Sequence, residues 1–128
     1  MTLARQTLGR DAEELVASRL RRAGWRIVAR NVRVSGARGE IDLVAVDADA
    51  LVFVEVKARR GGSLVGPETP TGAVGFAKRR KLRALAAAWL RERGYDVPRH
   101  RDLRFDVVGV RFDAAGQVVE WEHLRGAF

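Results

Sequence analysis

Two short β-rich runs in the middle of the chain limit its fold more than any other feature. Residues 40–46 and 51–58 are rich in valine and flank the turn sequence DADA, which predicts a β-hairpin. A turn centred between Ala48 and Asp49 pairs residues whose numbers sum to 97. One face of the hairpin is then wholly apolar, and the other changes from apolar to charged away from the turn. A sheet that is apolar on both sides needs cover on both sides.

The remaining elements complete one α/β domain. Helical spacing of apolar residues predicts helices over 8–23 and about 74–93, the first capped by Thr7 and ended by Gly24. The Gly/Pro-rich segment 59–72 predicts a long, mobile loop. Besides the hairpin, the expected strands are 25–34, 103–112 and 118–124. The expected order is α-β-β-β-α-β-β in a single domain over residues 1–128.

The composition indicates a folded, basic protein without thiol chemistry. With 47% apolar and 31% charged residues, 128 residues suit one globular domain. The absence of cysteine excludes disulfides and favours a reducing compartment. No signal peptide or membrane-spanning run is apparent, so we expect a cytoplasmic protein without membrane contact. The net charge of +8, nearly all of it from arginine, points to polyanions as partners, although general amino-acid usage explains it equally well.

The charged end of the hairpin carries the candidate chemistry. In the predicted register Asp42 faces Glu55, and Glu40 faces Lys57 on the same side. Two carboxylates opposed at about 5 Å repel each other unless a proton or a cation lies between them. Mg²⁺ takes one or two carboxylates together with water and substrate phosphate, and Mn²⁺ is the expected substitute. The alternative is a frayed sheet end with an ordinary ion pair between Glu40 and Lys57.

The same motif resembles the active-site core of a nuclease superfamily. Asp42, a twelve-residue gap and then Glu55-Val56-Lys57 resemble the D…(D/E)xK core of the restriction-endonuclease-like, or PD-(D/E)xK, nucleases. By the ordered stretches GRDAEELVASRL, GWRIVARN, GEIDLVAVD, LVFVEVKAR, KRRKL and RFDVV, the chain is identified as a member of the uncharacterised bacterial YraN family. That family is similar in fold to archaeal Holliday-junction resolvases. The resemblance implies a restriction-endonuclease-like α/β domain with a central mixed sheet flanked by helices.

The resemblance also implies roles for individual residues. Glu13 stands at the edge of the first helix's apolar stripe, one turn after Gly9, whose missing side chain permits close approach, whereas Glu14 faces solvent. Glu40, within the GEIDL signature, supports the site either as an outer metal contact or as a partner that orients Lys57. The implied catalytic residues are Asp42, Glu55, Lys57 and Glu13, and the implied Mg²⁺ ligands are Asp42, Glu55 and Glu13.

Basic residues flanking the loop are expected to bind nucleic acid. Lys78 and Lys81 match the family's basic start of the second helix, near a helix N-terminus where phosphates bind. Solvated surface charge accounts for these two lysines equally well. Arg59 and Arg60 are the basic residues that open the loop. Where the family usually has a hydroxyl-bearing residue at the helix start, this chain has Gly75.

Outside the hairpin, few residues suggest chemistry. Arg104 and Asp106 lie on one face of a strand and are expected to pair. The two histidines, expected at the surface, are His100 and His123. The tryptophans, expected in the core or at its rim, are Trp25, Trp89 and Trp121.

Three functions are compatible with these residues. The one they favour is a Mg²⁺-dependent endonuclease for DNA, selective for branched or flapped structures. A homodimer is a further expectation, because cutting paired strands needs two sites. The alternatives are a nucleic-acid-binding module that keeps the fold without cutting, and a nuclease that processes RNA. Opposed carboxylates argue against the pure binding module, which has no use for them.

Overall fold

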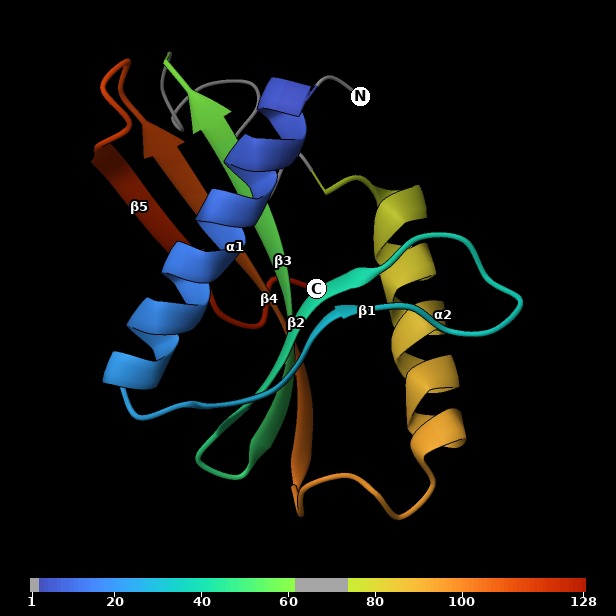
Figure 1. Ribbon diagram of the computed structural model, residues 1–128. Helices are drawn as coiled ribbons and strands as arrows, with labels where there is room; N and C mark the ends of the chain where they lie inside the picture. Colours follow the sequence, from blue (N-terminus) through green and yellow to red (C-terminus); the bar gives the residue numbers. More distant parts are fainter. Residues whose placement is uncertain (1–2, 62–73) are drawn as a thin grey trace.

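Five strands form one mixed sheet that lies between two helices (Figure 1). The computed structural model describes residues 3–61 and 74–128, with side chains from residue 7 onward. The elements in chain order are α1 (Leu3–Arg22), β1 (Arg26–Val32), β2 (Ile41–Asp47), β3 (Ala50–Arg60), α2 (Phe76–Arg93), β4 (Asp102–Phe112) and β5 (Val118–Leu124). The expected α/β class, the order α-β-β-β-α-β-β and the central mixed sheet flanked by helices are confirmed.

The strands lie side by side in their order along the chain, from β1 to β5. β3 and β4 run parallel, and the other neighbouring pairs are antiparallel. A parallel pair needs a crossover connection, and α2 provides it. In the hairpin Val44 faces Phe53 and Val46 faces Leu51, as predicted. The predicted register is therefore confirmed from the turn to the pair formed by Leu43 and Val54.

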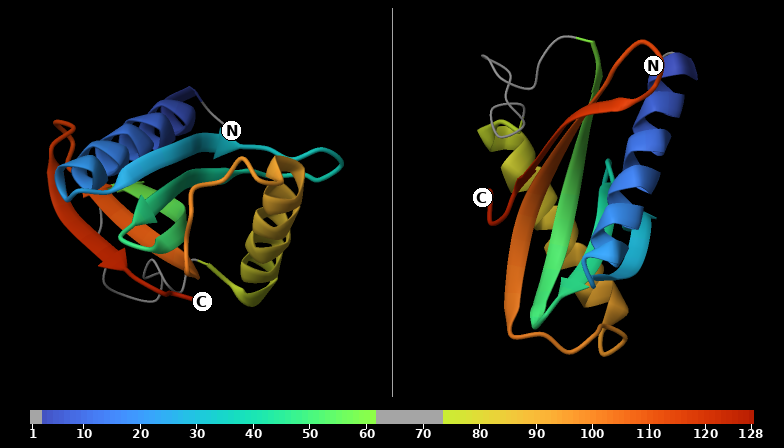
Figure 2. Two further views of the ribbon diagram at one scale, coloured as in Figure 1. Left: turned by 90° about the horizontal axis from the view of Figure 1, so that it is seen from below. Right: turned by 90° about the vertical axis from the view of Figure 1, so that its left-hand side faces the viewer.

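Each face of the sheet is covered by one helix, which explains why β2 and β3 are apolar on both sides (Figure 2). On the α1 side, Ala12, Val16 and Leu20 of the helix meet the sheet. On the α2 side, the helix contributes buried residues at the predicted spacing. These α2 residues are Leu82, Leu85, Ala86 and Trp89, and the buried strand residues that they join include Val44, Leu51, Phe53 and Val107.

The predicted alternation of side chains fails at one point, the start of β2. Leu43 belongs to the core under α1, whereas Ile41 belongs to the core under α2. Residues two apart on a regular strand share a face, so the backbone turns between them, at Asp42. The neighbouring strand is irregular at the same level, since Asn31 has a positive φ of 50°. This irregularity brings the side chain of Asp42 to the rim of the core.

Several element ends differ from the sequence prediction. Thr7 is not a helix cap, because α1 begins at Leu3 and runs through it. Arg59 and Arg60 belong to β3, where pairing with the long strand β4 keeps them extended, so they do not open a loop. The rest of the predicted mobile loop falls on 62–73, outside the described residues. Within the described residues, neither helix is long and apolar enough to cross a lipid bilayer.

Truncation of a central core residue tests the two-sided packing. Leu43 is fully buried under α1, so Leu43→Ala should lower the free energy of unfolding by about 2–5 kcal/mol, from lost apolar contact and the cavity left behind. Urea denaturation followed by circular dichroism measures the change. Leu103→Ala, at a half-exposed position on β4, is the matched control and should change it by less than about 1 kcal/mol. Equal effects would contradict this packing.

Candidate functional site

An open pocket of about 500 Å³ lies where β2 and β3 meet the first turns of α2. Its acidic side chains come from β2, β3 and the loop before β2, and its two lysines come from α2. The charged lining residues are Glu40, Asp42, Glu55, Lys78 and Lys81. The uncharged lining residues are Gly39, Ala77, Leu82 and Leu85. The tertiary structure thus brings five residues singled out in the sequence to one cavity.

Three carboxylates gather beside this pocket, and two of them, Glu40 and Asp42, line it. Glu13 from α1, Glu40 from the end of the β1–β2 loop and Asp42 from β2 each offer one oxygen, all within 4.8 Å of one another. Glu13 therefore lies beside Asp42, although the close approach expected at Gly9 was wrong. A Cβ atom at Gly9 would have no atom within 4 Å, so that glycine provides no close approach.

Asp42 is the most buried of the three, with 8% of the residue exposed. Its Oδ2 atom accepts a hydrogen bond of 2.8 Å from the backbone N–H of Val56, just beyond the last paired residues of β2 and β3. Burial, followed by the charge of Glu55, raises the pKa of Asp42 to about 8, against the opposing effect of the Val56 N–H. Asp42 therefore lies where a bound proton or a cation is favoured over a bare carboxylate.

Glu55 lies in the same pocket but has cationic partners. Its Oε1 atom is 3.0 Å from Nζ of Lys78 and 3.5 Å from Nζ of Lys57. Only 7% of Glu55 is exposed, so its carboxylate is largely shielded from water, whereas the side chains of Lys78 and Lys57 are partly exposed. The described pairing of β2 with β3 ends before Asp42 and Glu55, so the two carboxylates share the pocket without being paired residues of the ladder.

The protonation of the neighbouring groups follows from the same crowding. Burial, and then the charge of Glu40, raises the pKa of Glu13. Burial, and then the hydrogen bond with Lys78, lowers the pKa of Lys57, although Glu55 opposes this. Burial is the largest influence on Lys78 and acts to lower its pKa as well, but the charge of Glu55 and the hydrogen bonds with Glu55 and Lys57 together outweigh it, and the pKa is raised. The pKa values of the two lysines that contact Glu55 are thus shifted in opposite directions.

The loop before β2 places Glu40 and contacts Lys81. Gly39 has φ +93°, a backbone conformation that residues with a side chain rarely adopt, and a Cβ there would lie 3.0 Å from Cε of Lys81. Glu40 joins the carboxylate group and also lies 3.4 Å from Nη2 of Arg33. Glu40 therefore lies with the other carboxylates, whereas the ion pair described for Lys57 is with Glu55.

The donor set suits a hard divalent cation. Oxygens of one octahedral shell, about 2.1 Å from Mg²⁺, lie at most about 4.2 Å apart. The separation of up to 4.8 Å among the three carboxylates is within reach of that value by small side-chain rotations. The residues therefore fit Mg²⁺ or Mn²⁺, with Glu13, Glu40 and Asp42 nearest to one another and Glu55 beside them.

The other predicted nucleic-acid contacts divide into two groups. Lys78 and Lys81 line the pocket, and Gly75 caps α2 without a side-chain hydrogen bond, as the sequence indicated. Arg59 and Arg60, at the far end of β3, are not among the residues that line it. Any contact that these two arginines make with a ligand would lie outside the pocket.

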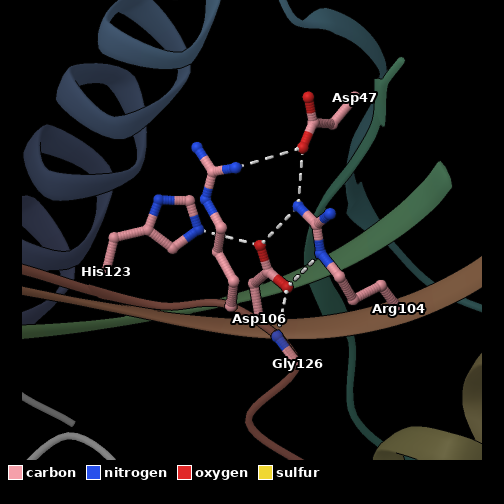
Figure 3. A network of polar contacts seen from close by, with 6 residues as sticks. Asp47, Arg104, Asp106, His123 and Gly126 are labelled. Atoms are coloured by element: carbon pink, nitrogen blue, oxygen red, sulfur yellow. Dashed lines mark hydrogen bonds and ion pairs between the residues drawn. The ribbon is translucent and has the colours of Figure 1, made fainter. Parts of the chain in front are cut away.

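A second polar cluster, on β4 and β5, was only partly predicted (Figure 3). Arg104 donates to Asp106 through Nε at 2.9 Å, as expected, and through Nη2 to Asp47 at 2.9 Å. The expectation that His123 is a surface residue was wrong, because its ring is bonded to Asp106 at 2.8 Å and is only 14% exposed. The backbone N–H of Gly126 also donates to Asp106. A charged residue inside the apolar run of β4 was the signal for such partners.

The buried carboxylate of this second cluster has its hydrogen-bond partners within the cluster. Burial acts to raise the pKa of Asp106, but its hydrogen bonds with His123 and Arg104 outweigh burial and lower it. Asp106 is wholly buried, and its carboxylate accepts from three residues. The ionised carboxylate of Asp106 therefore stabilises the fold, whereas the ionised carboxylate of Asp42 is unfavourable.

A mixed sheet between two helices, with carboxylates and lysines facing each other across a pocket, defines an α/β protein with a candidate cation and phosphate site. The chain belongs to the uncharacterised protein family UPF0102, or YraN family, which it matches over residues 12–110. A UPF0102 protein of Rhodococcus opacus is 46% identical over 121 residues, covering 94% of this chain and 95% of that relative. Another, of Nocardia farcinica, is 47% identical over 124 residues, covering 97% and 91%.

One solved structure shows a more distant likeness. It is the crystal structure of a FdxN element excision controlling factor protein from Anabaena variabilis, with a TM-score of 0.42 and 16% identity. The likeness covers 86% of this chain and 96% of that chain. The family membership rests on the sequence relatives.

The raised pKa of Asp42 predicts a pH-dependent stability of the metal-free protein. The unfolded chain loses this proton near pH 3.8, whereas the folded protein keeps it to about pH 8. The free energy of unfolding of wild type therefore falls as the pH rises from the first value to the second. Asp42→Asn keeps an acceptor for Val56 and has no such loss. In EDTA, the variant should gain up to about 5 kcal/mol over wild type between pH 4 and pH 8. Urea denaturation at both pH values measures this, and a pH-independent difference would contradict it.

Removal of the buried carboxylate of Asp106 should destabilise the protein, whereas removal of the Asp42 carboxylate should stabilise it. Asp106→Ala leaves Arg104 and His123 without their shared partner, which should lower the free energy of unfolding by about 3 kcal/mol at pH 7. Asp102→Ala, at an exposed position on the same strand, is the control and should change it by less than about 0.5 kcal/mol. Guanidinium denaturation of both variants distinguishes a structural cluster from a surface one.

Proposed function

We propose that this protein is a divalent-metal-dependent endonuclease that hydrolyses phosphodiester bonds of DNA. The observation that carries the proposal is one pocket with a group of carboxylates on one side and lysines on the other. A cation and a phosphate are the two ligands that such opposed charges accept together. A site for an anion alone would gain nothing from the acidic side, since it would repel phosphate.

Glu13, Glu40 and Asp42 would hold the cation, with Glu55 adjacent to them. When bound, Mg²⁺ or Mn²⁺ supplies charge neutralisation of the scissile phosphate and acidifies water. The Asp42 carboxylate is oriented by its bond to the N–H of Val56, which leaves its second oxygen for the cation. The residues that hold the cation come from a helix, a loop and a strand, so an intact fold is needed to form the site.

The lysines would act on the phosphate and on the attacking water. Lys57 lies on the central strand and is only 27% exposed, so its ammonium group has a narrow range of positions next to Glu55. There it would orient a water molecule and offset negative charge on the phosphate. Lys81 and Lys78 approach from α2 and would bind phosphate oxygens in the open part of the pocket. These positions are compatible with the roles that the family motif implies.

The basic surface of α2 supports nucleic acid as the substrate class. The first two turns of the helix contain five cations and no acidic residue. Those five are Lys78, Arg79, Arg80, Lys81 and Arg83. Backbone phosphate contacts of this kind carry little sequence information, so recognition of branched or flapped shape is the proposed specificity. RNA and a non-cutting binding module are the alternatives that the assay below separates.

Cleavage assays on defined substrates test the proposal. Linear, single-stranded, flapped and four-way DNA, with RNA in parallel, are incubated with Mg²⁺ or Mn²⁺ and separately with EDTA. We expect metal-dependent cleavage, highest on flapped or four-way DNA, and a loss of about 100-fold or more in Lys57→Ala and Asp42→Ala. Gel analysis of end-labelled strands measures the rates and positions of cutting.

Two neighbouring acidic residues of α1 provide a matched control. Glu13→Ala removes a member of the carboxylate group, whereas Glu14→Ala removes an exposed partner of Arg30 on the solvent side. Only Glu13→Ala should reduce cleavage. Salt-sensitive binding of DNA without cleavage of any substrate would overturn the enzyme assignment in favour of the binding module.

A further inference from the structure

Glu55 is engaged by lysines although it belongs to the predicted metal-binding motif. Its Oε1 atom contacts Lys78 at 3.0 Å and Lys57 at 3.5 Å. The carboxylates that lie closest to one another are instead Glu13, Glu40 and Asp42. Glu55 nevertheless lines the same pocket as two of them. A small change in its partners would therefore add it to the carboxylate group.

Lys78 is the partner that can leave. It lies on α2, outside the sheet, lines the pocket, and has 44% of its side chain exposed. Lys57 is on the same strand as Glu55, two residues away, and is more buried, with 27% exposed. A lysine ammonium on a flexible four-carbon chain readily exchanges one anionic partner for another. A phosphate entering the pocket would compete with Glu55 for Lys78.

We propose that Lys78 is a phosphate-responsive counterion of Glu55, which makes the binding of the cation and of nucleic acid cooperative. This inference rests on the proposed function of the pocket. Without a phosphate, Lys78 neutralises Glu55 and keeps it from the cation. With a phosphate bound to Lys78, Glu55 becomes a buried carboxylate without that partner, and contact with the cation replaces the lost charge. By linkage, each ligand raises the affinity for the other by the same factor.

The pocket provides a matched control in Lys81. Both lysines come from α2 and line the pocket, so replacing either removes one positive charge from it. Lys81 lies against Gly39 at the other side, and the ion pairs described for Glu55 are with Lys57 and Lys78. If Lys78→Met changes the affinity for the cation and Lys81→Met does not, the change is due to the contact with Glu55. The general charge of the pocket cannot explain it, because both variants lose one positive charge.

Titration of Mn²⁺ by isothermal calorimetry tests the inference without any cleavage. The proteins are wild type, Lys78→Met and Lys81→Met, each with and without dimethyl phosphate, the smallest phosphodiester, at constant ionic strength. We expect Lys78→Met to bind Mn²⁺ about tenfold more tightly than wild type without the phosphodiester, and Lys81→Met to show less than half that change. Dimethyl phosphate should tighten Mn²⁺ binding by wild type and leave Lys78→Met unchanged.

A double-mutant cycle identifies the partner. In a Glu55→Gln background, Lys78→Met should no longer affect Mn²⁺ affinity, because the carboxylate that it neutralises is absent. If Mn²⁺ binds and Asp42→Asn abolishes binding, but Lys78→Met equals wild type or keeps the phosphodiester effect, the counterion role is overturned and the metal site stands. If wild type does not bind Mn²⁺, or Asp42→Asn binds it equally, the proposed function fails and the counterion role fails with it.

Discussion

The hydrogen bond from the backbone N–H of Val56 to the Asp42 carboxylate is the contact on which the candidate site depends. It lies where β2 stops pairing with β3, while β3 continues beside β4. A side chain thus satisfies a half-buried backbone donor that lies beyond the described ladder between these two strands. The same contact holds Asp42 at the rim, where it meets Glu13 of one helix and faces the pocket beside the other.

Cover on both faces of the sheet decides where charge can lie. α1 and α2 each bury one side of the hairpin, so its middle is apolar on both faces. Ionised groups are stable only where the helices leave the sheet accessible or where each charge has a partner. The open end of the hairpin meets the first condition and holds the pocket. The cluster around Asp106 meets the second and lies inside the same sheet.

The two buried aspartates show how surroundings separate structure from candidate function. Both are nearly or wholly inaccessible, yet the pKa of Asp106 is lowered and that of Asp42 is raised to about 8. For Asp106, hydrogen bonds with His123 and Arg104 outweigh burial. For Asp42, burial and the charge of Glu55 outweigh one backbone N–H. A carboxylate left in that state lowers its free energy by taking up a proton or a cation, which is a property expected of a site and not of a core.

The sequence by itself determined the element order, the hairpin register and the motif of Asp42, Glu55 and Lys57, because strand alternation and helix periodicity are local properties of a chain. It did not determine which groups meet. The break in alternation between Ile41 and Leu43, the contact of Glu55 with Lys78 and the burial of His123 all depend on residues distant along the chain. Only the tertiary structure decided these, since side-chain partners and burial, and hence pKa, are set by packing between elements and not by spacing within one.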